Sequence, residues 1–172
     1  MFNFFKKKNS NLIDAKAGIK VISRIISHND SIVIDEINSL LENKEDYIKN
    51  NDRGIDESFD GNALFWFIMV DTLIKYGYVC ERDWKDEFDD FIYFLSNLKT
   101  FDLEINTESF NKDAGIIKWC EVIDKTFEPK CIGCIDIDSD SYVLFISSIE
   151  EIEDLKKLAA SISKKIDYAK NC

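Results

Sequence analysis

The sequence predicts an α+β fold that is mainly helical and contains a small antiparallel sheet. Two observations support this prediction. Apolar residues recur at helical spacing over most of the 172-residue chain. Only two stretches, near residues 78–81 and 131–146, are instead rich in β-branched and aromatic residues. So few strands, separated by helices, favour a small antiparallel sheet with helices packed against it.

The first half of the chain predicts three helices. The first begins near Asn11, follows a stripe of apolar residues and ends at His28–Asn29. Asp30 or Ser31 caps the second, and a short turn then leads through Tyr47 to Asn50. After a polar loop, the third helix spans about residues 62–76. It is apolar almost all round, which predicts the central helix of the fold.

The next segment predicts a short strand near residues 78–81 and then another helix. Asp83 is placed to cap this helix, and Asp86, three residues on, completes a near capping box. Residues 99–111 are expected to form a loop with one short strand. A further helix is predicted over about residues 112–127.

The last part of the chain predicts a β-hairpin followed by a helix. The hairpin covers about residues 131–146, with turn-forming aspartates and serines at its centre. Ser148 and Glu151 then form a capping box for the final long helix.

Length and composition predict one globular domain over residues 11–172, preceded by a flexible basic tail over residues 1–10. The N-terminus has no stretch long enough for the core of a signal peptide. The longest apolar run, Ala63–Val70, is far too short to cross a bilayer. The five cysteines are an odd number, which suits reduced thiols. The expected location is the cytoplasm.

The chain is strongly acidic, with 33 Asp and Glu against 22 Lys and Arg and a formal net charge of −11. Such a surface repels phosphate backbones and anionic lipid headgroups, so neither nucleic acid nor a membrane is an expected partner. The same potential favours a basic protein, although acidity also serves solubility alone. Nothing in the sequence indicates the oligomeric state.

Motifs for catalysis or cofactor binding are scarce. His28 is the only histidine, and its place at a predicted helix end favours a capping role. No nucleophile elbow, phosphate-binding glycine loop or dinucleotide fingerprint occurs. The sequence therefore predicts no cofactor and does not favour an enzyme.

Cys131 and Cys134 have the C-x-x-C spacing of redox and zinc motifs. They lead into a predicted strand, however, where positions three apart point to opposite faces. No second C-x-x-C pair exists to complete four ligands. Two small buried residues are the favoured interpretation, with metal binding left open.

Asp136, Asp138 and Asp140 are spaced two apart, as in the first half of a calcium-binding loop. The sixth position of such a loop is Ser141 instead of glycine, and the twelfth is Ser147 instead of glutamate. A hairpin turn in which the carboxylates bind backbone amides is therefore favoured over a metal site.

Asp71 lies inside the most apolar helix, where an unpaired carboxylate has a large desolvation cost. Lys75 follows four residues later and is the expected partner on the same helix face. This local pair is favoured over a functional buried acid.

Three segments, Leu64–Leu73, Asp83–Asp86 and Ile135–Tyr142, together resemble an uncharacterised bacterial family recorded only as a domain of unknown function. The resemblance covers roughly residues 30–168. It implies a small cytosolic bacterial protein without an assigned activity and supplies no catalytic residue. Members of the family tend to have glycine where Asp138 stands, which implies a different turn here.

Three functional hypotheses follow. The first is a protein-interaction module, for example an immunity-type protein, that binds a basic partner. The second is a metal-dependent enzyme or cation-binding protein that uses Asp136, Asp138 and Asp140. The third is a structural or regulatory module. For the first, the expected contact surface requires the short strand and the hairpin to share a sheet, and consists of Asp83, Trp84, Lys85, Asp138, Asp140 and Tyr142.

Overall fold

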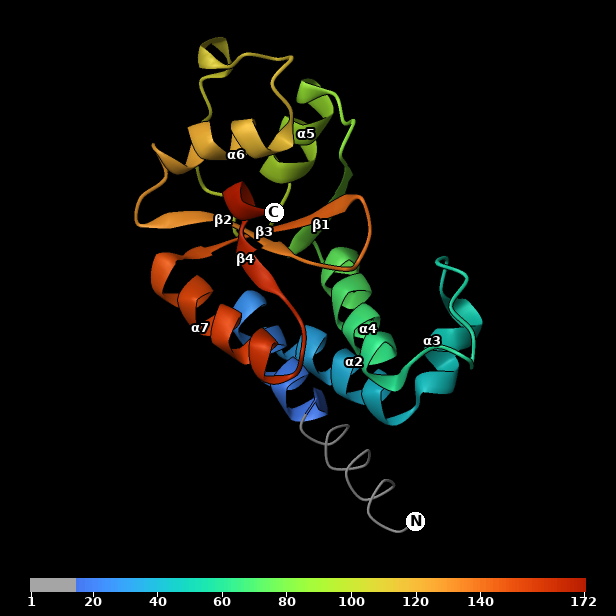
Figure 1. Cartoon of the computed structure of the whole chain (residues 1–172). Coiled ribbons are helices and arrows are strands. Elements are labelled where there is room, and N and C mark those ends of the chain that lie inside the picture. Colours follow the sequence, from blue (N-terminus) through green and yellow to red (C-terminus); the bar gives the residue numbers. More distant parts are fainter. Residues whose placement is uncertain (1–14) are drawn as a thin grey trace.

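The computed structural model describes residues 15–172. The predicted tail over residues 1–10 and the predicted helix start at Asn11 lie outside this range. A small antiparallel sheet runs through the middle of the fold, and helices cover both of its faces (Figure 1). The predicted mainly helical α+β fold is confirmed.

The sheet has four strands in the order β1-β3-β2-β4. They are β1 (Val79–Asp83), β2 (Lys130–Ile135), β3 (Ser141–Ser148) and β4 (Ile166–Tyr168). β2 and β3 form the predicted hairpin, and β1 pairs with the other side of β3. β4 was not predicted, because three residues are too few to show the alternation of a strand. β1 therefore forms one edge of the sheet and β4 the other.

One face of the sheet is covered by a helix over residues 15–26 together with α2 (Ser31–Glu42), α4 (Gly61–Lys75) and α7 (Ile149–Ser161). α4 is the predicted central helix. Its Trp66 is fully buried, and the indole Nε1 donates a hydrogen bond to the carbonyl of Asp136, 2.8 Å away. This bond ties the central helix to the end of β2.

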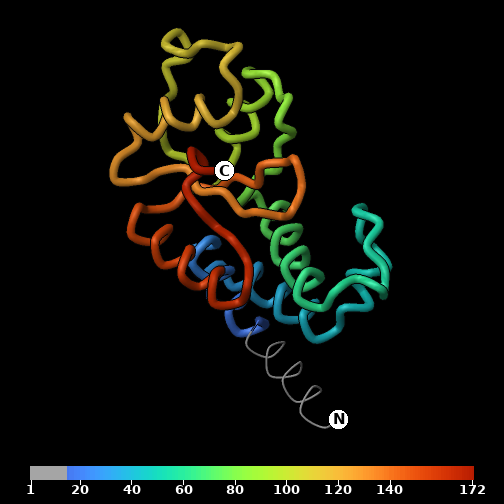
Figure 2. Tube along the Cα trace, viewed as in Figure 1, coloured from blue at the N-terminus to red at the C-terminus, as the bar shows by residue number. Residues whose placement is uncertain are grey.

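The opposite face is covered by α5 (Phe88–Ser96) and α6 (Ile116–Asp124). Trp119 of α6 lies between two phenylalanine rings of α5, Phe88 and Phe91, with both ring centroids 5.2 Å from its own. The chain then ends at this face, where the short helix η2 (Ala169–Asn171) packs against α6 (Figure 2). The sheet thus separates two hydrophobic clusters.

Several predicted helix ends are confirmed. His28 and Asn29 adopt left-handed backbone conformations, with φ of 50° and 60°, and end the first helix. The Asp30 carboxylate caps α2 by accepting from the amide of Ile32. Ser148 and Glu151 form the predicted capping box at the start of α7. The segment through Tyr47 to Asn50, which was expected to be a turn, instead forms a short further helix, α3 (Lys44–Asn50).

The prediction that Asp83 caps the following helix was wrong. Asp83 is the last residue of β1, and its carboxylate accepts from the amide of Lys85 within a tight turn. Asp86 instead binds the guanidinium of Arg82. α5 begins later, at Phe88, because Asp83 and Asp86 are already held by these local partners.

Two predictions in the middle of the chain also need correction. Residues 99–111 contain no strand, only the short 3₁₀ helix η1 (Thr107–Ser109). The helix predicted over residues 112–127 is shorter at both ends and spans α6 alone. At its start, the Asn111 side chain accepts from the amide of Asp113, which favours a turn over a helix.

Within residues 15–172, no helix is both long enough and apolar enough to span a membrane.

Candidate functional site

The two segments predicted to form a contact surface lie at the same end of the sheet. In the antiparallel β1–β3 pair, Asp83 lies opposite Ser141 and Arg82 lies opposite Tyr142. β1 therefore ends where β3 begins, and the turn after β1 is beside the turn that precedes β3. We call these residues the hairpin surface: Asp83, Trp84, Lys85, Asp138, Asp140 and Tyr142.

Most of the hairpin surface is exposed. Trp84 keeps 51% of its area accessible, and its indole ring lies 4.7 Å from the Lys85 ammonium. Asp83, Asp138 and Asp140 are exposed as well, whereas Tyr142 is half-buried. The surface thus combines one large exposed aromatic ring with carboxylates from two segments.

Two acids of the hairpin turn, Asp136 and Asp138, have partners among the neighbouring protein groups. Asp136 accepts a 2.9 Å hydrogen bond from the amide of Asp138, as predicted for a turn. The other carboxylate oxygen of Asp136, Oδ2, lies 3.8 Å from Lys165 Nζ, and Asp138 Oδ2 lies 3.8 Å from Lys164 Nζ. In the described part of the chain, no three His, Cys, Asp or Glu side chains are grouped to hold a metal ion. Cation binding by Asp136, Asp138 and Asp140 stays a prediction that a calcium titration tests.

Cys131 and Cys134 lie on opposite faces of β2, as the strand prediction required. Cys131 packs into the cluster on the α4 side and Cys134 into the cluster on the α6 side. Burial raises the pKa of the Cys131 thiol to about 12. The C-x-x-C spacing therefore does not bring these two sulfurs together.

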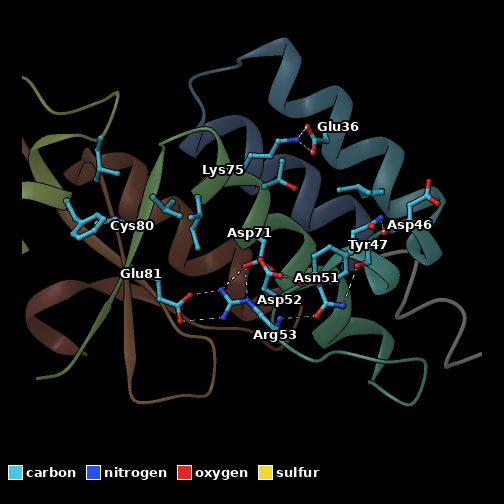
Figure 3. Close-up of a pocket in the computed structure, with 17 residues that line it drawn as sticks. Glu36, Asp46, Tyr47, Asn51, Asp52, Arg53, Asp71, Lys75, Cys80 and Glu81 are labelled. Carbon is cyan, nitrogen blue, oxygen red and sulfur yellow. Dashed lines mark hydrogen bonds and ion pairs between the residues drawn. The ribbon is translucent and has the colours of Figure 1, made fainter. Parts of the chain in front are cut away.

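A cleft that the sequence did not predict lies beside β1 (Figure 3). Its volume is about 830 Å³, within the range of small-molecule sites. Val79 and Glu81 of β1 line it, together with residues of α4 and with Phe94 of α5. Because α4 and α5 cover opposite faces of the sheet, the cleft passes along the outer edge of β1. We call it the β1 cleft, defined by the 17 lining residues of Figure 3.

The centre of the β1 cleft is an ion-pair network around Arg53 (Figure 3). The Arg53 Nε donates to Asp71 Oδ1 at 2.8 Å, and Nη2 donates to Glu81 Oε2 at 2.5 Å. The Tyr47 hydroxyl donates to the other oxygen of Asp71 at 2.6 Å. The side chains of Arg53, Asp71 and Glu81 are about three-quarters buried. Two carboxylates share one guanidinium, so this group has a formal charge of −1.

Asn51 holds the loop that presents Arg53. Its side-chain oxygen accepts from the amides of Arg53 and Ile55, at 3.1 and 2.9 Å. Its amide group donates to the carbonyls of Ile48 and Ile55. The Arg53 guanidinium also lies 5.0 Å from the ring centroid of Phe67. These contacts close the loop against α4 and direct the guanidinium into the cleft.

The cleft has an excess of negative charge. Five acidic and two basic side chains line it, which gives a formal charge of −3. Burial disfavours the charged form of Arg53, but its bonds to Asp71 and Glu81 outweigh this effect and raise the guanidinium pKa. Burial and the bond to Asp71 raise the pKa of Tyr47, so its hydroxyl stays a donor. The arrangement favours a cationic ligand.

The predicted pair between Asp71 and Lys75 was wrong. Asp71 is held by Arg53 and Tyr47, which approach α4 from α3 and the loop that follows it. Lys75 instead binds Glu36 of α2, with Nζ 2.7 Å from the carboxylate. An aspartate inside an apolar helix was the only sign of the cleft in the sequence, because Arg53 lies in a polar loop without a pattern.

Comparison with known proteins gave one finding. No curated protein and no solved structure matched the chain. The family described as Domain of unknown function (DUF6630) matched residues 19–169, slightly more than the range expected from the resemblance. A match over most of the described residues shows that this chain belongs to the DUF6630 family of domains of unknown function.

Proposed function

We propose that the protein is a cytoplasmic protein-interaction module that binds a basic partner protein through the hairpin surface. The observation that supports this most directly is the register of β1 against β3, which gathers an exposed tryptophan and acids from two segments. Tryptophan and tyrosine dominate the affinity of many interfaces, while exposed carboxylates speed the encounter with a basic partner. An immunity-type protein is one example of such a module.

The overall charge supports the same partner class. A net charge of −11 attracts basic proteins over distances of about 10 Å at ordinary salt concentrations and repels nucleic acids. All five cysteines are free thiols, in keeping with a reducing compartment.

Affinity enrichment from the native host at low salt tests this proposal. The full-length protein is compared with a variant that combines Trp84→Ala, Asp138→Asn and Asp140→Asn. A control variant, Glu150→Gln with Asp154→Asn, removes two charges from α7, which covers one face of the sheet. We expect one basic protein to be recovered by the wild type and the control but not by the triple variant.

The recovered protein is then purified and titrated against all three forms. We expect its affinity to fall with rising salt and to fall at least about tenfold in the triple variant, since central aromatic residues often contribute more than 1.4 kcal/mol. Recovery of no partner, or equal binding by the triple variant, would contradict the proposal.

A further inference from the structure

The outer edge of β1 is open to another strand. Among residues 15–172, β1 pairs only with β3, so the backbone groups on its other side have no strand beside them. The strand has five residues and is about 16 Å long. An unpaired edge of this length is the kind of surface to which an extended peptide adds through main-chain hydrogen bonds.

The β1 cleft follows this edge. It carries negative charge at the place where a strand added to β1 would put one of its side chains. Glu81 lies at the middle of β1, and its side chain points to the α4 side, where Asp71 lies. The only hydrogen bond that Glu81 Oε1 accepts from the described residues is a long one, 3.4 Å from Arg53. Asp71 and Glu81 together exceed the charge of Arg53 by one, and an added cation would neutralise this excess.

We infer that the β1 cleft receives an extended segment of a basic partner, which adds to β1 as a further strand and places a lysine beside Glu81 and Asp71. This inference depends on the proposed function, since it specifies how the basic partner binds. The hairpin surface continues from the same strand, because Trp84 directly follows β1.

The cleft also indicates what should flank that lysine. Side chains alternate between the two faces of a sheet, and residues opposite each other on neighbouring strands share a face. The neighbours of the lysine would therefore point to the α5 side, where Phe94 lines the cleft and is 42% exposed. The expected sequence is apolar, lysine, apolar, in an extended conformation.

A second copy of this chain suits the edge less well than a basic partner does. Each copy has a net charge of −11, and the cleft itself has a formal charge of −3. Pairing two β1 edges would bring the two acidic clefts together, and like charges that face each other across an interface are unfavourable.

Fluorescence anisotropy with a defined peptide tests the inference on the full-length protein. The probe is a fluorescein-labelled heptapeptide, Lys-Thr-Val-Lys-Val-Thr-Lys, whose central lysine has apolar neighbours. One matched peptide replaces the central lysine with glutamine. Two others are N-methylated, one at both valines and one at the central lysine and both threonines. In strand addition only alternate amides face the neighbouring strand, so only one N-methylated set removes bonds to β1.

Protein variants complete the design. Glu81→Gln keeps the shape of the side chain and leaves the bonds between Arg53 and Asp71 in place. Glu150→Gln makes the same chemical change at an exposed residue of α7 that belongs neither to the cleft nor to the hairpin surface, and it is the matched control. Thermal denaturation of both variants verifies that they fold, and the peptide series on the wild type requires no variant at all.

We expect the peptide to bind the wild type and the Glu150→Gln variant equally well. We expect at least about tenfold weaker binding with Glu81→Gln and with the glutamine peptide, because a charge-assisted bond is lost in each case. One N-methylated peptide should fail to bind and the other should bind. The inference is overturned if the probe does not bind, if both or neither of the N-methylated peptides bind, or if sedimentation shows that the free protein pairs through β1.

The outcome also separates the two proposals. Suppose that affinity enrichment recovers a partner whose binding depends on Trp84, but the peptide does not bind. This result would support the proposed function and contradict only strand addition in the β1 cleft. If the enrichment recovers no partner either, the proposed function fails as well.

Discussion

The hairpin surface and the β1 cleft lie next to each other along β1. Both present carboxylates, but those of the hairpin surface are exposed and those at the centre of the cleft are partly buried. The acids of the hairpin surface are exposed, and the nearest lysine nitrogen to Asp138 is 3.8 Å away. Two acids of the cleft, Asp71 and Glu81, are about three-quarters buried and hold Arg53 at hydrogen-bonding distance. Exposed carboxylates supply charge at little energetic cost, whereas partly buried ones fix the positions of the groups around them.

A matched pair of substitutions gives the largest contrast. Asp71→Asn removes the charge that Arg53 and Tyr47 bind, and we expect it to lower the free energy of unfolding by about 2 kcal/mol. Asp138→Asn makes the same chemical change at an exposed site, and we expect a change below about 0.5 kcal/mol. Urea denaturation of both variants measures the difference. Equal effects would mean that the two surfaces do not differ as described.

Two tyrosines, Tyr47 and Tyr78, make the stability of the fold sensitive to alkaline pH. The pKa of Tyr47 is raised in the fold by burial and by its bond to Asp71. A group with a raised pKa stabilises the fold below its unfolded pKa, and this stability is lost as pH rises through the folded value. Burial and the bond to Asp30 likewise raise the pKa of Tyr78, to about 12. Since an unfolded tyrosine has a pKa of about 10, we expect the free energy of unfolding to fall from about pH 10 upwards.

The contribution of Tyr47 is isolated by Tyr47→Phe. We expect this variant to lose less stability between pH 9 and 11 than the wild type, by at most about 1.4 kcal/mol per pH unit. Tyr142→Phe is the control from the hairpin surface. Burial raises the pKa of Tyr142 too, but without an aspartate bonded to its hydroxyl, so we expect a smaller change in slope. A larger change for Tyr142→Phe would contradict the comparison.

Backbone conformation offers a smaller contrast. Gly54, beside Arg53, and Asp138, in the hairpin turn, both have left-handed conformations, with φ of 70° and 58°. Gly54→Ala should therefore destabilise the fold by about 1 kcal/mol, because a Cβ disfavours this conformation. Asp138→Gly should be neutral or stabilise by up to about 1 kcal/mol. Thermal denaturation measures both changes, and a stabilising Gly54→Ala would contradict this account.

The two regions also differ in how far the sequence could predict them. The residues of the hairpin surface come from two short segments, and their meeting required only that a strand and a hairpin share a sheet. The cleft brings together Tyr47, Arg53, Asp71 and Glu81 from four separate elements or loops. No spacing in the sequence records such contacts.

Local errors had a similar cause. Asp71 and Lys75 have the spacing of a helical pair, but each found a partner on another segment. Asp83 was expected to cap a helix and instead ended a strand whose length depends on pairing with β3. The capping box of Ser148 and Glu151 was predicted correctly, because all of its contacts lie within four residues. Asp83 also binds a group only two residues away, but the strand that it ends is formed with a segment about 60 residues further along the chain, which local spacing does not record.

Amide hydrogen exchange measured residue by residue with and without the basic heptapeptide tests the central claim most directly. We expect peptide binding to slow exchange at alternate amides of residues 79–83, on the outer edge of β1. We expect no such alternation at residues 136–140. Slower exchange confined to the hairpin turn, or no change in β1 at saturating peptide, would contradict strand addition to β1.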